Sequence, residues 1–258
     1  MRPQLLYDPL LLTERLGQAA TDAIRLRKLR RTPAAVLRKG HIDSLELLEI
    51  LRPTPPRVIY DIGANIGTWT VLAKTIYPQA AVHAFEPLTC HVEKFKPMTR
   101  AVSDVHLHEV CLGSARGEAE LRVVDFSDAS SLLPLSEVGE RQWGLHEASR
   151  EKVRVERLDD WVAEHRLPPP DLIKLDVQGF EVEVLKGAAE CMGHAAAVLT
   201  EVSFREFYKG QCMFHDVVRL MAENDFWLAA FGQGVKLGFP MLQCDGFFLR
   251  RALVGQLR

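Results

Sequence analysis

Strand and helix patterns alternate along the chain from residue 57 onward, and this alternation restricts the fold more than any other feature. Short β-branched apolar runs predict strands at 57–62, 82–86, 105–111, 172–177 and 197–202. Stretches with helical spacing lie between them at 68–77, 89–98 and 181–192. Strands and helices that alternate over such distances favour right-handed βαβ units and a mainly parallel, doubly wound α/β sheet. A ligand of such a sheet binds at the carboxyl ends of its strands.

Two further parts of the chain interrupt or extend this pattern. Residues 113–170 form an insert between the third and fourth strands, with extended stretches at 118–124 and 152–158. Near the end of the chain, residues 226–231 and 242–250 predict two adjacent strands joined by a Gly-rich turn. We therefore expect an antiparallel hairpin at the C-terminal edge of the sheet.

Three prolines separate this α/β region from what precedes it. Pro53, Pro55 and Pro56 break any helix and mark a boundary. We expect a helical extension over residues 1–52 and a single α/β domain over residues 53–258. The extension is basic, because it holds ten Lys and Arg against six Asp and Glu, and the rest of the chain is acidic.

The basic extension contains a predicted helix at residues 10–30 with cations at its C-terminal end. Our interpretation is a solvated helix whose cations suit the helix dipole. The alternatives are contact with an anionic membrane surface, with a phosphate-bearing substrate or with a partner chain, including homo-oligomer formation through residues 1–52. The apolar positions that repeat at helical spacing are Leu12, Leu16, Ala19, Ala20, Ala23 and Ile24.

Composition excludes several classes of protein. The chain has 258 residues, of which 47% are hydrophobic, so it buries a full core without disulfide or metal cross-links. A net charge of −2 argues against a nucleic-acid-binding surface over the whole domain. No apolar run approaches the roughly 20 residues that cross a bilayer. The five cysteines are widely spaced, which indicates reduced thiols and a cytoplasmic protein.

A Gly-rich turn follows the first predicted strand and leads directly into a helix. Gly63 and Gly67 allow a sharp turn and close approach to a ligand, and Asn65 can adopt the left-handed conformation. Glu86 ends the next strand, where a carboxylate accepts hydrogen bonds from a ribose. A pyrophosphate requires a helix N-terminus free for an anion, so Asp61 at the strand tip favours a sulfonium cofactor instead. The alternative role of both glycines is tight packing.

Ionisable residues gather at the ends of the fourth and fifth predicted strands. Lys174 and Asp176 share one face of a strand, and Glu201 ends the neighbouring strand. Asp176 is a candidate general base or helix N-cap, and Lys174 a candidate ion-pair partner or acid/base group with a lowered pKa. A divalent metal held by Asp176 and Glu201 stays an alternative. His215 follows in a segment expected to cover the cleft, and it is a further candidate base.

A set of ordered motifs runs along the chain: VIYDIGANIGTWT (58–70), AFEP (84–87), SSLLPL (130–135), VRVERLDDWV (153–162), DLIKLDVQGFEVEVLKGA (171–188) and LTEVSFREFYKGQ (199–211). This set resembles the family of FkbM-type S-adenosylmethionine-dependent methyltransferases over about residues 43–250. The chain differs from the family at Gln178, where the family more often has Glu, and in residues 111–114.

The resemblance implies a class I methyltransferase fold and methyl transfer to a hydroxyl oxygen of a sugar, glycolipid or polyketide-type small molecule. By this similarity Asp61, Gly63, Asn65 and Gly67 line the methionine part of the cofactor, and Glu86 binds its ribose. Residues 110–113, which include Cys111 and Leu112, approach its adenine. The competing hypotheses are an NAD-dependent oxidoreductase, since Glu86 also suits its ribose, and a cofactor-binding scaffold without catalysis.

Overall fold

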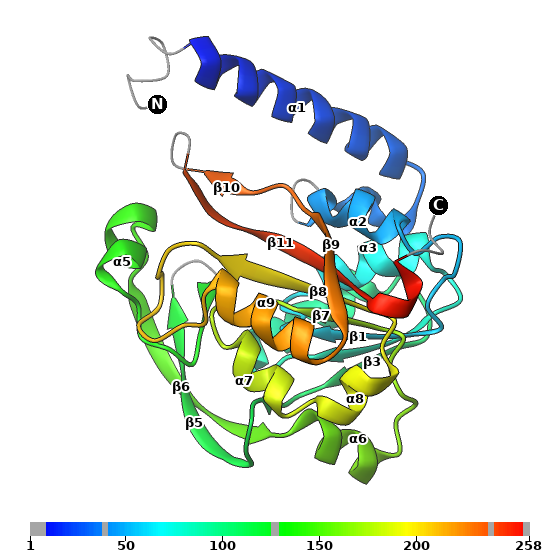
Figure 1. Cartoon of the computed structure of the whole chain (residues 1–258), viewed down its shortest axis with the longest axis vertical. Helices are drawn as coiled ribbons and strands as arrows, with labels where there is room; N and C mark the ends of the chain where they lie inside the picture. The colour runs from blue at the N-terminus through cyan, green and yellow to red at the C-terminus, as the bar shows by residue number, and fades with distance from the viewer. Residues whose placement is uncertain (1–8, 38–40, 125–128, 237–239, 255–258) are drawn as a thin grey trace.

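A computed structural model describes residues 9–37, 41–124, 129–236 and 240–254. Its centre is a sheet with strand order β10–β11–β8–β7–β1–β2–β3, in which β9 also pairs with β11 (Figure 1). The first five strands along the chain that join this sheet are parallel to one another. The strands are β1 (Val58–Ile62), β2 (Ala81–Phe85), β3 (Val105–His108), β7 (Leu172–Leu175), β8 (Ala197–Ser203), β9 (Phe226–Phe231), β10 (Val235–Lys236) and β11 (Met241–Arg250).

Both predictions about this sheet are confirmed. It is mainly parallel and doubly wound, and β11 lies antiparallel to β8 and to β9 at the C-terminal edge. The strand order reverses between β1 and β7, because β2 and β3 extend in one direction from β1 and β8 and β11 in the other. Such a reversal opens a crevice at the carboxyl ends of the two central strands.

Helices cover both faces of the sheet because its central strands are buried at successive positions, whose side chains point to opposite faces. Leu172 and Phe247 pack with one helical layer, whereas Ile173 and Phe248 pack with the other. The first layer contains α3 (Thr68–Ile76), with α4 (Thr89–Thr99) beside it. The second layer contains α6 (Leu158–His165), α7 (Glu181–Lys186), α8 (Ala189–His194) and α9 (Phe214–Glu223).

The insert folds into a second sheet of three strands, in the order β4–β6–β5. These strands are β4 (Cys111–Leu112), β5 (Gly117–Val124) and β6 (Glu147–Glu156), and α5 (Glu137–Trp143) lies between β5 and β6. The predicted strand over 105–111 is therefore wrong in its extent. The strand ends at His108, because the backbone N–H of Val110 donates a hydrogen bond to the His108 carbonyl. Cys111 pairs with β6 of the second sheet.

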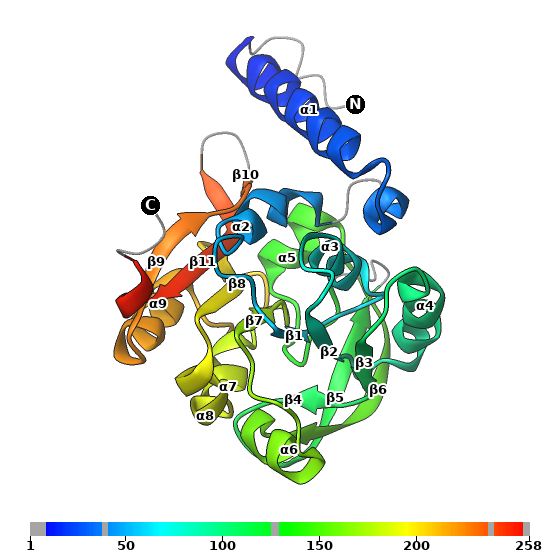
Figure 2. The ribbon, with the colours of Figure 1, turned by 90° about the vertical axis from the view of Figure 1, so that its right-hand side faces the viewer.

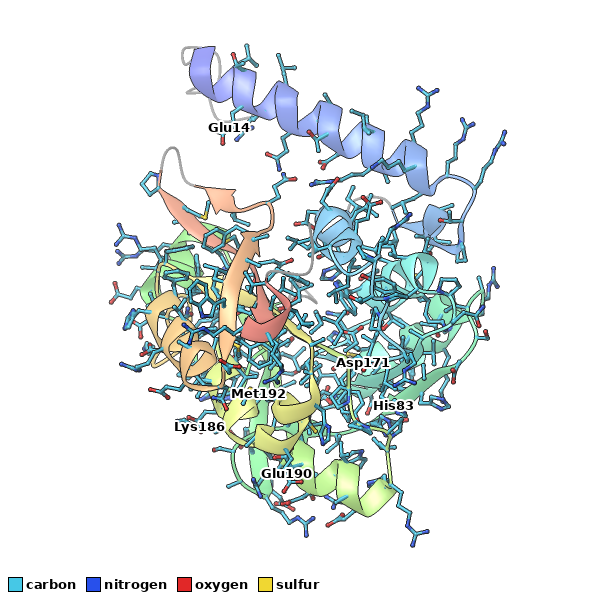
Figure 3. The ribbon with its side chains drawn as sticks, turned by 45° about the vertical axis from the view of Figure 1, so that its right-hand side comes forward. Glu14, His83, Asp171, Lys186, Glu190 and Met192 are labelled. Carbon is cyan, nitrogen blue, oxygen red and sulfur yellow. The ribbon has the colours of Figure 1, made fainter. Side chains whose placement is uncertain are left out.

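The predicted helix over 181–192 is two helices, α7 and α8 (Figure 3). Gly187 separates them, and a Cβ at this position would lie 2.1 Å from the carbonyl oxygen of Gly113. The Asp159 carboxylate accepts hydrogen bonds from the backbone N–H groups of Glu190 and Cys191, which caps a new helix start. Apolar periodicity cannot show either feature, because both depend on segments far away in the chain.

The predicted N-terminal helix is confirmed as α1 (Pro9–Leu29), which stands away from the sheet (Figure 2). Its side chains Leu12, Leu16 and Ile24 are 49%, 63% and 59% exposed. Its contacts with membranes or with a second copy stay predictions. No described helix is long and apolar enough to cross a bilayer.

The rest of the extension joins the core. Leu48 and Leu51 are buried in the same apolar cluster as Trp69 of α3. The predicted boundary between residues 52 and 53 stays a prediction. This part of the chain holds η2 (Pro33–Val36), η3 (Ile42–Ser44) and α2 (Leu45–Glu49).

Candidate active site

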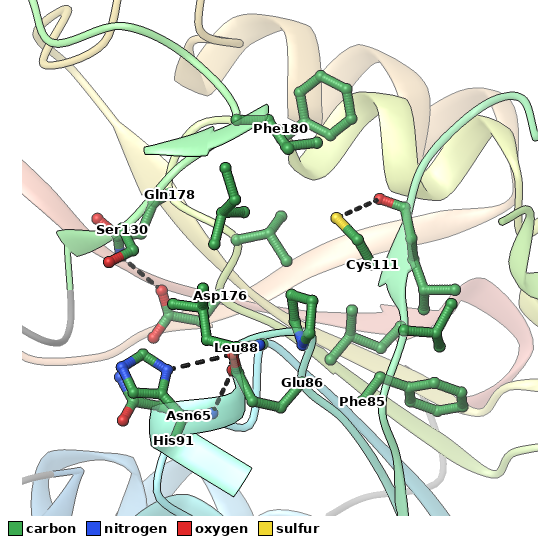
Figure 4. Close-up of a pocket in the computed structure, with 18 of the residues that line it drawn as sticks. Asn65, Phe85, Glu86, Leu88, His91, Cys111, Ser130, Asp176, Gln178 and Phe180 are labelled. Carbon is green, nitrogen blue, oxygen red and sulfur yellow. Dashed lines mark hydrogen bonds and ion pairs between the residues drawn. The ribbon is translucent and has the colours of Figure 1, made fainter. Parts of the chain in front are cut away.

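A cleft with a cavity of about 80 Å³ lies at the carboxyl ends of β1, β2 and β7 (Figure 4). Four parts of the chain supply its walls: the loop after β1, the segment after β2, the insert and the loop after β7. His41, from the N-terminal extension, also lines it.

The loop between β1 and α3 brings the backbone close to this cleft. Gly63 has φ +73°, and a Cβ there would lie 1.9 Å from the carbonyl oxygen of Asp176. Asn65 adopts the predicted left-handed conformation with φ +49°, and both residues line the cleft. Gly67 is different. It is buried, and its missing Cβ makes room for Phe95 and Thr99 of α4, so its packing role is the one observed.

Asp61 lies below this loop and does not face the cleft. Its carboxylate is fully buried, Oδ2 accepts a hydrogen bond from the Thr70 hydroxyl at 2.5 Å, and Oδ1 lies 3.3 Å from Lys174 Nζ. The expected direct contact between Asp61 and the cofactor is therefore corrected. The side chain points to the neighbouring strand because Asp61 and Lys174 are register partners in β1 and β7.

Lys174 is a buried cation held by carboxylates on both sides. Its Nζ also lies 3.8 Å from Asp176 Oδ2 and donates to the Gly63 carbonyl at 3.1 Å. Burial alone lowers the pKa of Lys174, but Asp61 and Asp176 outweigh burial and raise it. The ion-pair interpretation therefore holds, with Asp61 as the nearer partner, and the interpretation as an acid/base group with a lowered pKa is wrong.

Glu86 stands at the end of β2, in the cleft wall, where the sequence predicts it. Its carboxylate already accepts from the backbone N–H groups of Asn65 and Leu88, each at 2.9 Å, and lies 3.1 Å from His91 Nδ1. A carboxylate has about four acceptor positions, so these contacts leave room for a hydroxyl. Sequence reasoning missed His91, which lies in the first turn of α4, five residues after Glu86.

Apolar side chains form the opposite wall. Cys111 and Leu112 line the cleft beside Phe180, as expected for the residues after the third strand. Burial raises the pKa of the Cys111 thiol to about 12, so it stays neutral at physiological pH. An apolar wall facing a backbone cradle and a strand-end carboxylate fits a nucleoside.

Asp176 presents a carboxylate to the cleft, and 24% of its side chain is exposed. It does not cap the following helix. The N-cap of that helix, α7, is Phe180, which makes no side-chain cap hydrogen bond. Glu181 Oε1 accepts from the backbone N–H groups of Val177 and Gly179 in the loop before the helix. The proposed capping role of Asp176 is therefore wrong, and its carboxylate is available for chemistry.

Glu201 and Asp245 extend this acidic group across the next two strands. They are register partners in β8 and β11, and Ser44 of the extension donates a hydrogen bond to Asp245 at 3.1 Å. Burial and then the Asp176 charge raise the pKa of Glu201, and burial and then Asp43 raise that of Asp245 to about 6. Sequence reasoning missed Asp245. The only feature of the sequence that could have indicated it was the predicted hairpin, whose second strand contains this residue.

His215 does not belong to this group. It lies in the first turn of α9 with 73% of its side chain exposed, and its ion-pair partner is Asp216. The expected catalytic role is corrected, because the covering segment turns this residue to solvent and places Tyr208 inside. Among the described residues, no group of three or more His, Cys, Asp or Glu side chains could hold a metal ion.

Comparison with known proteins agrees with this geometry. The family model "Methyltransferase FkbM domain" matches residues 61–228 of this chain. The 2-O-methyltransferase NoeI of Sinorhizobium fredii is 30% identical over 215 residues, which cover 80% of this chain and 85% of NoeI. The hexuronic acid methyltransferase AglP of Haloferax volcanii is 28% identical over 192 residues, covering 72% of this chain and 68% of AglP.

A solved structure shares the fold. The FkbM methyltransferase of Methylobacillus flagellatus superimposes with a TM-score of 0.50 and 15% sequence identity. The match covers 74% of this chain and 43% of the longer solved chain. The family match includes the Gly63 loop, Glu86, the Asp176 strand end and Glu201. This chain is therefore a methyltransferase of the FkbM family, with the class I fold that its sheet order and its cleft display.

Proposed function

We propose that this methyltransferase uses S-adenosylmethionine to methylate a hydroxyl oxygen of a sugar-containing acceptor. One observation carries the proposal. Asp176 presents a carboxylate to the cleft, fixed by Lys174, at the strand end beside the Gly63 loop. The names of NoeI and AglP, which describe 2-O-methylation and a hexuronic acid substrate, support the choice of acceptor class.

The residues of the cleft fit this cofactor. Gly63 and Asn65 bring the backbone close to its amino-acid portion, Glu86 has acceptor capacity left for a ribose hydroxyl, and Cys111 and Leu112 offer an apolar wall for the adenine. When bound, the cofactor supplies an electrophilic methyl group. The protein must then orient the acceptor and remove a proton.

Asp176 is the group that removes this proton. A sugar hydroxyl is a weak nucleophile, and a carboxylate that accepts its proton during the displacement contributes about 10²–10⁴-fold in rate. Lys174 Nζ lies 3.8 Å from Asp176 Oδ2 and holds the carboxylate in place at the strand end. Positioning supplies a further share of the rate, because both reactants are held by the ends of rigid strands.

The proposal is tested with S-adenosylmethionine and a panel of methyl glycosides, including a methyl hexuronide, with products identified by mass spectrometry. We expect one methyl group on a hydroxyl oxygen, and a drop of about 10²–10⁴-fold in kcat for Asp176→Asn. Calorimetry should show binding of S-adenosylhomocysteine and none of NAD. Binding of NAD alone, or methylation confined to amine acceptors, contradicts the proposal.

Metal dependence is decided in the same assay. We expect equal rates with and without EDTA, because no group of three or more His, Cys, Asp or Glu side chains among the described residues could hold a metal ion. A rate that EDTA removes and Mg²⁺ restores would instead assign Asp176 and Glu201 as ligands.

A further inference from the structure

Gln178 occupies the space between the two carboxylates at the strand ends. Its side-chain Nε2 donates to Asp176 Oδ1 at 2.7 Å and to Glu201 Oε2 at 3.2 Å. One amide therefore connects the end of β7 to the end of β8. Figure 4 shows this amide beside Asp176 in the wall of the cleft.

Two other contacts fix the orientation of this amide. The Tyr208 hydroxyl lies 2.9 Å from Gln178 Oε1 and donates to it or to the Ala129 carbonyl at 2.8 Å. Oε1 therefore faces Tyr208, and the NH₂ group faces the carboxylates. The Gln178 backbone has φ +55°, a conformation that costs a non-glycine residue free energy, and the Ser131 hydroxyl holds its carbonyl at 2.7 Å.

The two carboxylates are not equivalent in this arrangement. Asp176 and Gln178 line the cleft, whereas Glu201 contacts Gln178 from the neighbouring strand. Each oxygen of Asp176 faces a different donor, with Lys174 near Oδ2 and Gln178 at Oδ1. Two donors on one carboxylate fix both its position and its plane.

We propose that Gln178 is a positioning residue that orients Asp176 toward the acceptor hydroxyl, with Glu201 as the second anchor of its amide. This inference rests on the proposed function. It assigns Glu201 a supporting role, so proton removal belongs to Asp176 alone. A methionine at this position has a similar size but donates to neither carboxylate.

Kinetics of Gln178→Met test the role in catalysis. We expect kcat to fall roughly tenfold to a hundredfold, as for a misplaced reacting group, while the Kd of S-adenosylhomocysteine changes less than threefold. Gln211→Met is the matched control. Gln211 is a buried glutamine in the adjacent loop, and it bonds the backbone of Phe207, Tyr208 and Arg205 rather than a carboxylate. Unchanged kcat in Gln178→Met, or an equal loss in Gln211→Met, would overturn the proposal.

A second measurement needs no acceptor. In ¹H–¹⁵N spectra, the Gln178 side-chain amide is assigned by its loss in Gln178→Met, and its exchange with D₂O is followed. We expect slow exchange in the wild type and at least tenfold faster exchange in Asp176→Ala. Exchange at the rate of a solvated amide would overturn the proposal. If the wild type methylates no glycoside, the proposed function fails, and this measurement still decides whether Gln178 holds Asp176.

Discussion

Lys174 is the residue on which the charges of the site depend. It is the cation between a fully buried carboxylate, Asp61, and a partly exposed one, Asp176. Asp61 Oδ1 makes no hydrogen bond within the described structure, so the ion pair alone compensates its burial. An ionised carboxylate without a partner is costly in a low-dielectric interior. The pair therefore supports stability and catalysis together.

We expect Lys174→Ala to lower the free energy of unfolding by about 3–5 kcal/mol, because it leaves Asp61 buried without a countercharge. Urea denaturation followed by circular dichroism measures the change. Arg52→Ala is the control. Arg52 is 63% exposed and pairs with Glu49 at the surface, so the free energy should change by less than about 0.5 kcal/mol. A loss below about 1 kcal/mol for Lys174→Ala would contradict the role of this ion pair in stability.

Two loops cross above the sheet, and the site depends on their close approach. The loop after β1 passes so near the loop after β7 that Gly63 has no space for a Cβ. We expect Gly63→Ala to displace the Asp176 backbone and to weaken S-adenosylhomocysteine binding by at least tenfold in calorimetry. Gly193→Ala in α8 is the control, because a Cβ there meets nothing within 4 Å. Equal affinities in the two variants would mean that the loops separate without cost.

Histidines stack between β2 and the edge strand β3, and they predict a pH dependence of stability. His108 Nδ1 accepts from the Trp161 indole, so its Nε2 donates to His83 Nδ1 at 3.1 Å. Burial, with like charge from His106, lowers the pKa of His83 to about 4, and burial, with His83 and His165, does the same for His108. Asp104 is the nearby anion, and it raises the pKa of His83.

Both histidines are neutral in the fold and titrate near 6.5 when unfolded. The unfolded chain therefore binds more protons between pH 6.5 and 4, and stability falls as the pH falls through this range. We expect His83→Leu to flatten this slope in urea denaturation at pH 7.5, 6, 5 and 4.5. The buried acids contribute equally to both proteins and cancel in the difference. A slope as steep as that of the wild type would contradict the lowered pKa of His83.

At the scale of the molecule, the sequence predicts the features that depend on local pattern. Strand and helix patterns that alternate along the chain predict the parallel sheet, and the positions of the Gly63 loop and Glu86 follow from the predicted ends of the first two strands. The rest depends on contacts between distant segments. Ser44 and Asp245, which form a hydrogen bond, are 201 positions apart in the chain, and Gln178 and Tyr208, which form another, are 30 apart. Gly187 has no space for a Cβ because the Gly113 carbonyl lies against it. The predicted roles of His215 and Asp61 are wrong for the same reason. A period of 2 or 3.6 residues predicts the face on which a side chain lies, but it does not predict which segment packs against that face.

The last prediction concerns how much of the N-terminal extension the fold requires. Leu45, Leu47, Leu48 and Leu51 are buried in the core cluster of α3 and the sheet. Full burial of a leucine contributes about 1.5–3 kcal/mol, so losing all of them costs roughly 6–12 kcal/mol, comparable to the 5–15 kcal/mol of a typical domain. Residues 12–20 of α1 are exposed and contribute little.

We therefore expect a chain without residues 1–20 to unfold in urea within about 1 kcal/mol of the full chain. A chain of residues 53–258 should lack a cooperative transition and fail to bind S-adenosylhomocysteine. If residues 53–258 instead unfold cooperatively and bind this ligand, the prolines mark a true domain boundary. In that case the leucines of α2 cover a core that is already stable, and the extension serves the site mainly through His41 and the Ser44 contact with Asp245.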